Sequence, residues 1–458
     1  MAVACVAAVI RGWVLFDDPL AHGYDGYYYA LQVRSMLAGD ALFADTSAAL
    51  WGMTALAAVV GDVVVSNKLA VCVFAGVAAA GGAVAARRWF HSRAAMAVTG
   101  LLWATSALHL AVSSEFVKNA AGIAVLAWLI AALADAHRHV YRMVGCVLLA
   151  LGGLFVHKLT GVFGVVLLLT VVPSWLPQVR LRRVPWWAIA GTGVLAIAAL
   201  AGGVLRVVDF SRFAQGLGRL GDRMQPFQDG RLVWSEQLAL IGVYTAPLVL
   251  AVLAWRRRTE PDGALLRGLA VLAVFSCAPG LPFGYDLTAW RLVLMGFVAV
   301  GLTAGWAAKR LPWMGALSVA VAVVGLPSTV ASRQAKEPDY GAWVAVVPVI
   351  QQHVAADESL VAHRGLCGFL WFETGRRCEN FQPVGEPDGW WRVAYGFGPA
   401  QLESSGPVVP LRPAYLLVPE SAWRDFAAHH DYSLIRHPLN PYRPRPDFVY
   451  GPQDEPAP

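Results

Sequence analysis

Charged residues are scarce in this sequence. Only 14% of its 458 residues are Asp, Glu, Lys or Arg, whereas an ordinary soluble protein carries about a quarter. The deficit lies almost entirely before residue 332, and 57% of the whole chain is hydrophobic. This composition excludes an ordinary soluble protein and indicates a polytopic membrane protein. The formal net charge of +6 mostly reflects membrane topology, so it gives no reason to infer a nucleic acid partner.

Several motifs that carry chemistry elsewhere are also missing. There is no Gly-rich loop of the phosphate-cradling kind, no zinc-ligand spacing and no nucleophile elbow. These absences argue against an ATP-driven pump and against a hydrolase. No clear internal repeat is present either, which weakens the interpretation as a transporter built from repeated halves.

Cysteine is scarce as well, with six residues in the chain. Four lie in apolar segments, where Cys usually behaves as a small buried hydrophobe. Only Cys367 and Cys378 lie in the polar tail. In an oxidising compartment this pair suggests one disulfide, but spacing alone does not fix the geometry, so two free thiols remain the alternative.

Long apolar runs are what the sequence has in abundance. A membrane-crossing helix needs about 20 mostly apolar residues. Residues 48–61 are too short to cross and break at Gly61-Asp62, so we expect an interfacial or re-entrant helix there. The expected spans number eleven, at about 1–16, 66–86, 94–113, 119–136, 143–157, 159–178, 186–205, 237–255, 267–282, 291–308 and 313–331.

Basic residues test this count. With a cytoplasmic N-terminus, all five inner loops are basic, as at Arg87-Arg88, Arg256–Arg258 and Lys309-Arg310. This is the positive-inside pattern. Counting 48–61 as a span would invert every later loop. The pattern therefore predicts a multi-pass plasma-membrane protein with an extracytoplasmic C-terminal domain.

The chain is thus expected to be mainly α, with a transmembrane domain at 1–331 and a soluble α/β domain at 332–458. The first outer loop is long and holds an amphipathic segment from Tyr27 to Leu37. In the tail we expect helices at Tyr340–His353 and Ser421–His429, and strands at Ser359–His363, Ala414–Val418, Tyr432–Arg436 and Asp447–Tyr450.

Ionisable groups beside the spans gather on the expected outer side, where by default they suggest function. Basic residues in such short outer loops oppose the topology rule, and an anionic ligand explains them most simply, because Arg and Lys suit phosphate. The candidates, loop by loop, are Asp17, Asp18, Asp25 and Arg34; Glu115 and Lys118; His157 and Lys158; an Arg/Asp-rich stretch at 206–235; and Asp286 and Arg291.

The most specific string runs from Tyr24 to Arg34, with Asp25, clustered tyrosines and then the arginine. In the first outer loop this pattern resembles the GT-C superfamily of membrane glycosyltransferases, which includes oligosaccharyltransferase catalytic subunits, protein O-mannosyltransferases and lipid A aminoarabinose transferases. The closest likeness is to uncharacterised prokaryotic members. The strings Ser114–Asn119 and Tyr285–Arg291 agree with it. Two departures stand out: the second motif has one acid rather than two, and no Lys-Pro-Pro string occurs near 47–51.

The resemblance implies an inverting glycosyltransferase that uses a polyprenyl-phosphate-linked sugar donor in the membrane lipid and a glycan, protein or lipid acceptor. Asp25 is the expected catalytic base and Glu115 a second catalytic acid. Asp25 and Glu115 could instead hold Mg²⁺ or Mn²⁺. The expected substrate-binding residues are Tyr28, Arg34, Lys118, His157, Lys158, Asp286 and Arg291.

Plainer interpretations stand beside these. Tyr27–Tyr29 would also suit an interfacial aromatic belt, Glu115 could pair with Lys118 one turn away, and His157 could be a packing residue. The main rival function is a transporter or flippase of a lipid-linked anionic substrate, which predicts charges near the bilayer midplane and discontinuous helices. A non-enzymatic scaffold is a second rival, but it leaves the outer charges without a role.

Overall fold

The computed structural model forms two compact units. It describes residues 1–23, 25–40, 42, 47–136, 139–172, 233–260, 262–277, 287–335, 340–362, 364–379, 389–395, 409–411 and 415–423. We call Met1–Asp17, Ala44–Gly61 and Val65–Gln334 the helical unit. The tail unit comprises Asp18–Phe43, Asp62–Val64 and Ala335–Pro458. The first outer loop therefore belongs with the tail, although about 300 residues separate them in the sequence.

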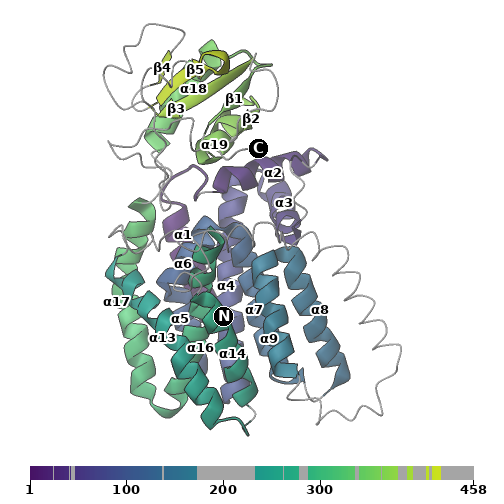
Figure 1. Cartoon of the computed structure of the whole chain (residues 1–458), viewed down its shortest axis with the longest axis vertical. Helices are drawn as coiled ribbons and strands as arrows, with labels where there is room; N and C mark the ends of the chain where they lie inside the picture. Colours follow the sequence, from purple (N-terminus) through teal and green to yellow (C-terminus); the bar gives the residue numbers. More distant parts are fainter. Residues whose placement is uncertain are drawn as a thin grey trace. The chain divides into compact units, whose positions relative to one another are not determined.

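The helical unit is built from apolar helices that lie side by side (Figure 1). Neighbours in sequence pack together, as α7, α8 and α9 do, and so do distant pairs such as α5 and α16. The helices are α1 (Ala2–Leu15), α3 (Ala48–Val60), α4 (Val63–Phe90), α5 (Arg93–Thr105), α6 (Ala107–Glu115), α7 (Val117–Leu133), α8 (Val140–Val156), α9 (Lys158–Val171), α13 (Trp234–Arg256), α14 (Gly263–Ser276), α15 (Leu287–Met295), α16 (Phe297–Arg310) and α17 (Pro312–Ala335).

The mainly α, polytopic membrane fold is confirmed. Among the described residues, four helical segments are long and apolar enough to cross a membrane: α4, α13, Arg291–Arg310 and α17. The bent pair of α5 and α6 makes a fifth if it counts as one span. Six shorter apolar helices accompany them. The count of eleven spans stays a prediction, and the expected span at 186–205 lies outside the described residues.

Helix α3 coincides with the apolar stretch that is too short to cross. The Ser47 side chain accepts a hydrogen bond from the amide of Ala49 at its start, which satisfies an amide that has no partner within the helix. Gly61 ends it in a left-handed conformation, at φ +83°, which costs glycine little. The serine and the glycine therefore fix the two ends of α3.

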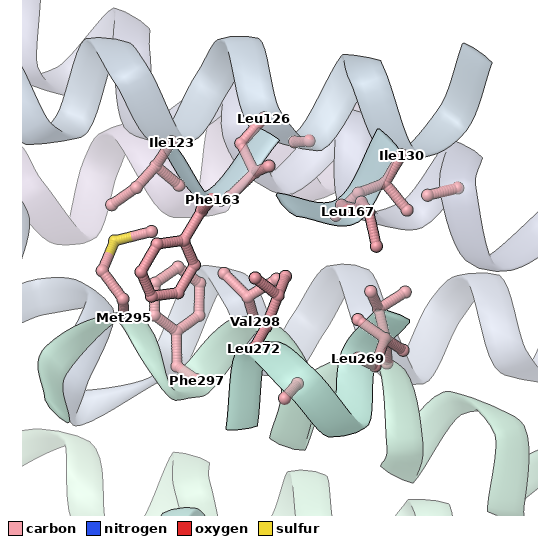
Figure 2. Packing of buried hydrophobic residues seen from close by; sticks show 14 of the residues in the cluster. Ile123, Leu126, Ile130, Phe163, Leu167, Leu269, Leu272, Met295, Phe297 and Val298 are labelled. Atoms are coloured by element: carbon pink, nitrogen blue, oxygen red, sulfur yellow. The ribbon is translucent and has the colours of Figure 1, made fainter. Parts of the chain in front are cut away.

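The core of the helical unit lies between α7, α9, α14 and α16. Figure 2 shows apolar side chains from these helices interdigitating, among them Ile123, Phe163, Leu269 and Phe297. Small residues allow close approach: a Cβ added to Gly161 of α9 would lie 2.4 Å from the amide nitrogen of Leu154 in α8. Close backbone contact through small residues is typical of helices packed in membranes.

A bend of 48° separates α5 from α6 at Ser106. At such a break, carbonyls at the end of the first helix lose their usual donors four residues on. Two buried side chains take their place. Arg11 of α1 donates to the Ala104 carbonyl, and Nδ1 of His109 donates to the Trp103 carbonyl at 2.7 Å. Buried side chains of this kind make a broken helix tolerable inside a membrane.

The tail unit contains a small mixed sheet in the order β2-β1-β3-β5-β4. Strand β1 is parallel to β2 and β3, and β5 is antiparallel to β3 and β4. Its described elements are α2 (Gly26–Leu37), α18 (Tyr340–His353), β1 (Ser359–Val361), α19 (Arg364–Thr374), β2 (Cys378–Glu379), β3 (Trp390–Tyr395), β4 (Val409–Leu411) and β5 (Tyr415–Pro419).

The predicted C-terminal α/β domain is confirmed. Helix α18 and strands β1 and β5 match expected elements, whereas α19 and β3 were not expected from the sequence. The expected strands at 432–436 and 447–450, and the helix at 421–429 beyond residue 423, lie outside the described residues. Cys367 and Cys378 form a disulfide that joins α19 to β2.

Candidate functional site

Charged residues of the helical unit lie at opposite ends of the same helices. Helix α13 begins near Glu236 and ends at Arg256. Helix α7 begins next to Glu115 and ends where Arg88 of α4 donates to the Ala131 carbonyl. One end therefore carries the basic residues of the expected inner loops, and the other carries acids mixed with bases.

A buried ion-pair network lies at the mixed end. One guanidinium nitrogen of Arg333 donates to Glu115 at 2.5 Å, and the other donates to Glu236. The side chains of Arg333 and Glu236 are each 3% exposed, whereas that of Glu115 is 27% exposed. The network joins α6, α13 and α17. Two carboxylates therefore share one guanidinium. Because Glu115 is the most exposed of the three side chains, it is the one that solvent or a ligand can reach.

Glu236 has a second role at the start of α13. Its other oxygen accepts a hydrogen bond from the amide of Val233, at 3.3 Å. A carboxylate in the first turn of a helix is favoured by the free amides there. Glu236 and Arg333 were not among the site residues predicted from the sequence. The available signal was their ionisable side chains beside long apolar runs, which by default suggest function or pairing.

Three predicted site residues meet at the junction of α6 and α7. Glu115 ends α6, Phe116 separates the helices, and Lys118 lies in the first turn of α7. The guanidinium carbon of Arg291 lies 4.2 Å from the centroid of the Phe116 ring, within cation–π range. Glu115 and Lys118 thus flank Phe116 in the chain, and Arg291 contacts the Phe116 ring. Asp286 lies outside the described residues.

His157 and Lys158 lie at a second junction, between α8 and α9. Nδ1 of His157 accepts from the amide of Thr160 at 3.5 Å, which caps α9 weakly. Lys158 is exposed. A Cβ added to Gly122 of α7 would lie 3.0 Å from the Cβ of His157, so this junction packs against α7 near the first one.

Asp25 lies in the tail unit, at the N-cap of α2, and is 4% exposed. Its backbone carbonyl accepts from the amide of Tyr29 at 3.0 Å. The positive end of the helix dipole favours a negative charge at this position. Asp25 thus lies at the start of a short helix in the loop that follows α1.

The tyrosines that follow Asp25 have separate environments. Tyr27 and Tyr29 are buried, and Tyr28 is half-buried with its ring centroid 5.4 Å from that of Tyr29. Burial raises the pKa of the Tyr27 hydroxyl, so this side chain stays neutral. Of the three, Tyr28 is the most accessible to a ligand.

Arg34 lies near the C-terminal end of α2 and contacts α19. Its guanidinium nitrogen Nη1 donates to the Phe372 carbonyl of α19 at 3.0 Å. Its guanidinium carbon lies 4.3 Å from the centroid of the Phe372 ring. These contacts occupy a side chain that the sequence analysis assigns to substrate.

Comparisons with solved structures identify the fold. The chain is similar to ArnT from Cupriavidus metallidurans in the apo state, with a TM-score of 0.59, 16% identity, and coverage of 92% of this chain and 97% of that one. The structure of C. metallidurans ArnT bound to undecaprenyl phosphate matches with the same TM-score and the same coverage of both chains, at 15% identity. This chain has the GT-C fold.

More distant matches include the Archaeoglobus fulgidus oligosaccharyltransferase in the apo form, at a TM-score of 0.47 and 11% identity over 82% of this chain and 64% of that one. No protein-family model and no curated protein matches the sequence. The GT-C fold expected from the sequence is thus confirmed by the two ArnT structures, at 15–16% identity.

The carboxylates do not present a ready metal site within the described part of the chain. There, no three His, Cys, Asp or Glu side chains gather as ligands. One oxygen of Glu115 already accepts from the Arg333 guanidinium, a cation that competes with any metal for it. The predicted Mg²⁺ or Mn²⁺ site at Asp25 and Glu115 stays a prediction.

Proposed function

We propose that this protein transfers a sugar from a polyprenyl-phosphate-linked donor to an acceptor hydroxyl at the extracytoplasmic face of the membrane. The observation that carries the proposal is the fold shared with ArnT over nearly the full length of both chains. One of those ArnT structures holds undecaprenyl phosphate, a polyprenyl phosphate. The GT-C fold supports this class of reaction, and the charged residues are candidates for binding and proton transfer.

The α6–α7 junction supplies the cations for the donor phosphate. Lys118 and Arg291 lie there beside Glu115 and Phe116. A phosphate in a partly dry site is stabilised by a cation more strongly than in water, and charge builds on the phosphate as it leaves. Tyr28, His157, Lys158 and Asp286 remain proposed substrate contacts.

Asp25 is the proposed general base. The acceptor oxygen attacks the anomeric carbon while the bond from that carbon to the phosphate oxygen breaks. Asp25 takes the acceptor's proton, and the polyprenyl phosphate leaves with the electron pair. A single displacement of this kind inverts the anomeric configuration, so the product's stereochemistry tests the one-step mechanism.

The test of this function is sugar transfer from donor to acceptor by the purified full-length protein. Polyprenyl phosphates carrying different sugars are offered with a panel of glycan, peptide and lipid acceptors. Acceptor-dependent formation of free polyprenyl phosphate is expected for at least one pair. Movement of the intact donor between leaflets, with the sugar still attached, would favour a flippase and contradict the proposal.

The two cations should act on the donor. Arg291→Lys keeps the charge but loses the planar fork that binds phosphate with two hydrogen bonds, so donor affinity is expected to fall about tenfold. Lys118→Ala is expected to weaken donor binding similarly. Binding and turnover are followed by titration of the donor. Lys309→Ala, at the basic end of α16, is the matched control. Unchanged donor affinity in both variants would mean that these cations only anchor helix ends.

The proposed topology is tested separately. A reporter fused after Arg257 is expected in the cytoplasm, because basic loops stay inside. A reporter fused after Pro458 is expected outside. The opposite location of either reporter would overturn the span count.

A further inference from the structure

Helix α2 lies against one face of α19 within the tail unit, and aromatic contacts define that face. The ring centroid of Tyr27 lies 5.1 Å from that of Phe369, nearly edge-on at 79°, and 5.5 Å from that of Phe372. Edge-to-face pairs at this separation contribute beyond the area they bury. A Cβ added to Gly368 would lie 3.1 Å from the Cβ of Tyr27, so the two helices approach each other closely at this glycine.

Arg34 provides a second contact two turns further along the same face of α2. Phe372 lies in the last turn of α19, where carbonyls lack donors within the helix. The Arg34 guanidinium donates to the Phe372 carbonyl and lies over the Phe372 ring. A cation at a helix C-terminus also complements the helix dipole. Both halves of α2 are thus attached to α19.

Helix α19 is in turn fixed to the sheet. The disulfide from Cys367 to Cys378 links it to β2. Phe369 lies 5.5 Å from the ring centroid of Trp343 in α18. The Trp343 indole donates to the Tyr415 hydroxyl of β5 at 2.9 Å. A continuous set of buried contacts therefore runs from the sheet through α19 to α2.

We propose that Arg34 and Phe372 are positioning residues that hold Asp25 by fixing α2 on α19, and that Arg34 does not bind the donor phosphate. The inference rests on the proposed function, in which Asp25 is the base. Asp25 caps α2, so a shift of this helix on α19 displaces the carboxylate. A displacement of about 1 Å in a reacting group can cost about 100-fold in rate.

The experiment is a double-mutant cycle in the full-length chain. Arg34→Ala removes the cation, and Phe372→Leu removes the aromatic face while keeping an apolar side chain. Each is expected to speed amide hydrogen exchange in residues 26–37 and to lower kcat about 10- to 100-fold. Donor affinity should stay within about twofold of the original protein. Because both variants lose the contact between the Arg34 guanidinium and the Phe372 ring, the double variant should lose less than the product of the single losses.

Gly368→Ala is a gentler probe of the same contact. The added methyl group meets Tyr27 at 3.1 Å, so α2 must shift by a few tenths of an ångström while α19 gains helix propensity. A fall in kcat with unchanged donor affinity is expected. Gly145→Ala in α8 is the matched control, since a Cβ there meets nothing within 4 Å.

The outcomes separate the possibilities. Losses that multiply in the double variant would overturn the inference. A drop in donor affinity for Arg34→Ala alone would also overturn it, because Arg34 would then be a phosphate ligand. If the original protein transfers no sugar, the proposed function fails, and the exchange rates of α2 across the cycle still decide whether Arg34 and Phe372 hold it.

Discussion

Asp25→Asn is expected to lower sugar transfer about 10²- to 10⁴-fold, the usual loss when a positioned base is removed. The amide has nearly the same shape as the carboxylate but cannot accept the acceptor's proton. Asparagine is also a good N-cap residue, so α2 should still start at Gly26. The variant should therefore fold and insert normally. Turnover of the purified variant at saturating donor measures the effect.

The control for this substitution is Asp357→Asn, at an exposed position in the tail unit, which should leave turnover unchanged. Near-normal turnover in Asp25→Asn would remove this residue from the mechanism. Asp17, Asp18 or Glu115 would then be the next candidate for the base. Glu115 is the most accessible member of its network, which makes Glu115→Gln the first variant to follow.

Among the substitutions discussed, Arg333→Met is expected to lower the free energy of unfolding the most. Removing one partner of a buried ion pair leaves an uncompensated charge, which typically costs about 3–5 kcal/mol. Glu236 is 3% exposed and would lose this cation while it lies among apolar helices. Methionine fills much of the arginine volume, so lost packing contributes little. Thermal unfolding in detergent, compared with Arg310→Met at the end of α16, measures the difference.

A second substitution tests the cause of this loss. Glu236→Gln removes the stranded charge while keeping the capping contact to the Val233 amide available to a side-chain oxygen. The double variant Arg333→Met/Glu236→Gln should therefore be more stable than Arg333→Met alone. If the double variant is instead less stable than both single variants, the network does not act through the buried charge of Glu236.

The sequence predicts most helices of this protein because their apolar runs are long. Helix α3 and helix α18 fall within one residue of their expected bounds. The break at Ser106 was missed because neither Pro nor Gly marks it and the apolar run continues through it. Helix α19 was missed because it is short and contains Gly368, and because α2, one of the helices it packs against, lies more than 300 residues earlier.

The proposed site residues come from local features of the sequence. Asp25 stands out because clustered tyrosines and Arg34 follow it, and Glu115 because it is an acid at the end of an apolar segment. Their partners follow from tertiary structure instead. Glu115 is 218 residues from Arg333, so the sequence offers only the neighbouring Lys118 as a pairing candidate. Arg34 resembles a phosphate ligand in the sequence, and its contact with Phe372 across 338 residues emerges only on folding.

The pairing of α2 with α19 also constrains biosynthesis. Helix α2 leaves the ribosome early, whereas α19 begins at Arg364, and at about 5–20 residues per second the wait lasts roughly 15–65 s. During that interval α2, which begins after Asp25, cannot pack against α19. The tail unit thus completes the first loop, so a chain whose synthesis has not yet reached α19 would lack the helix that holds α2 and the proposed base, Asp25.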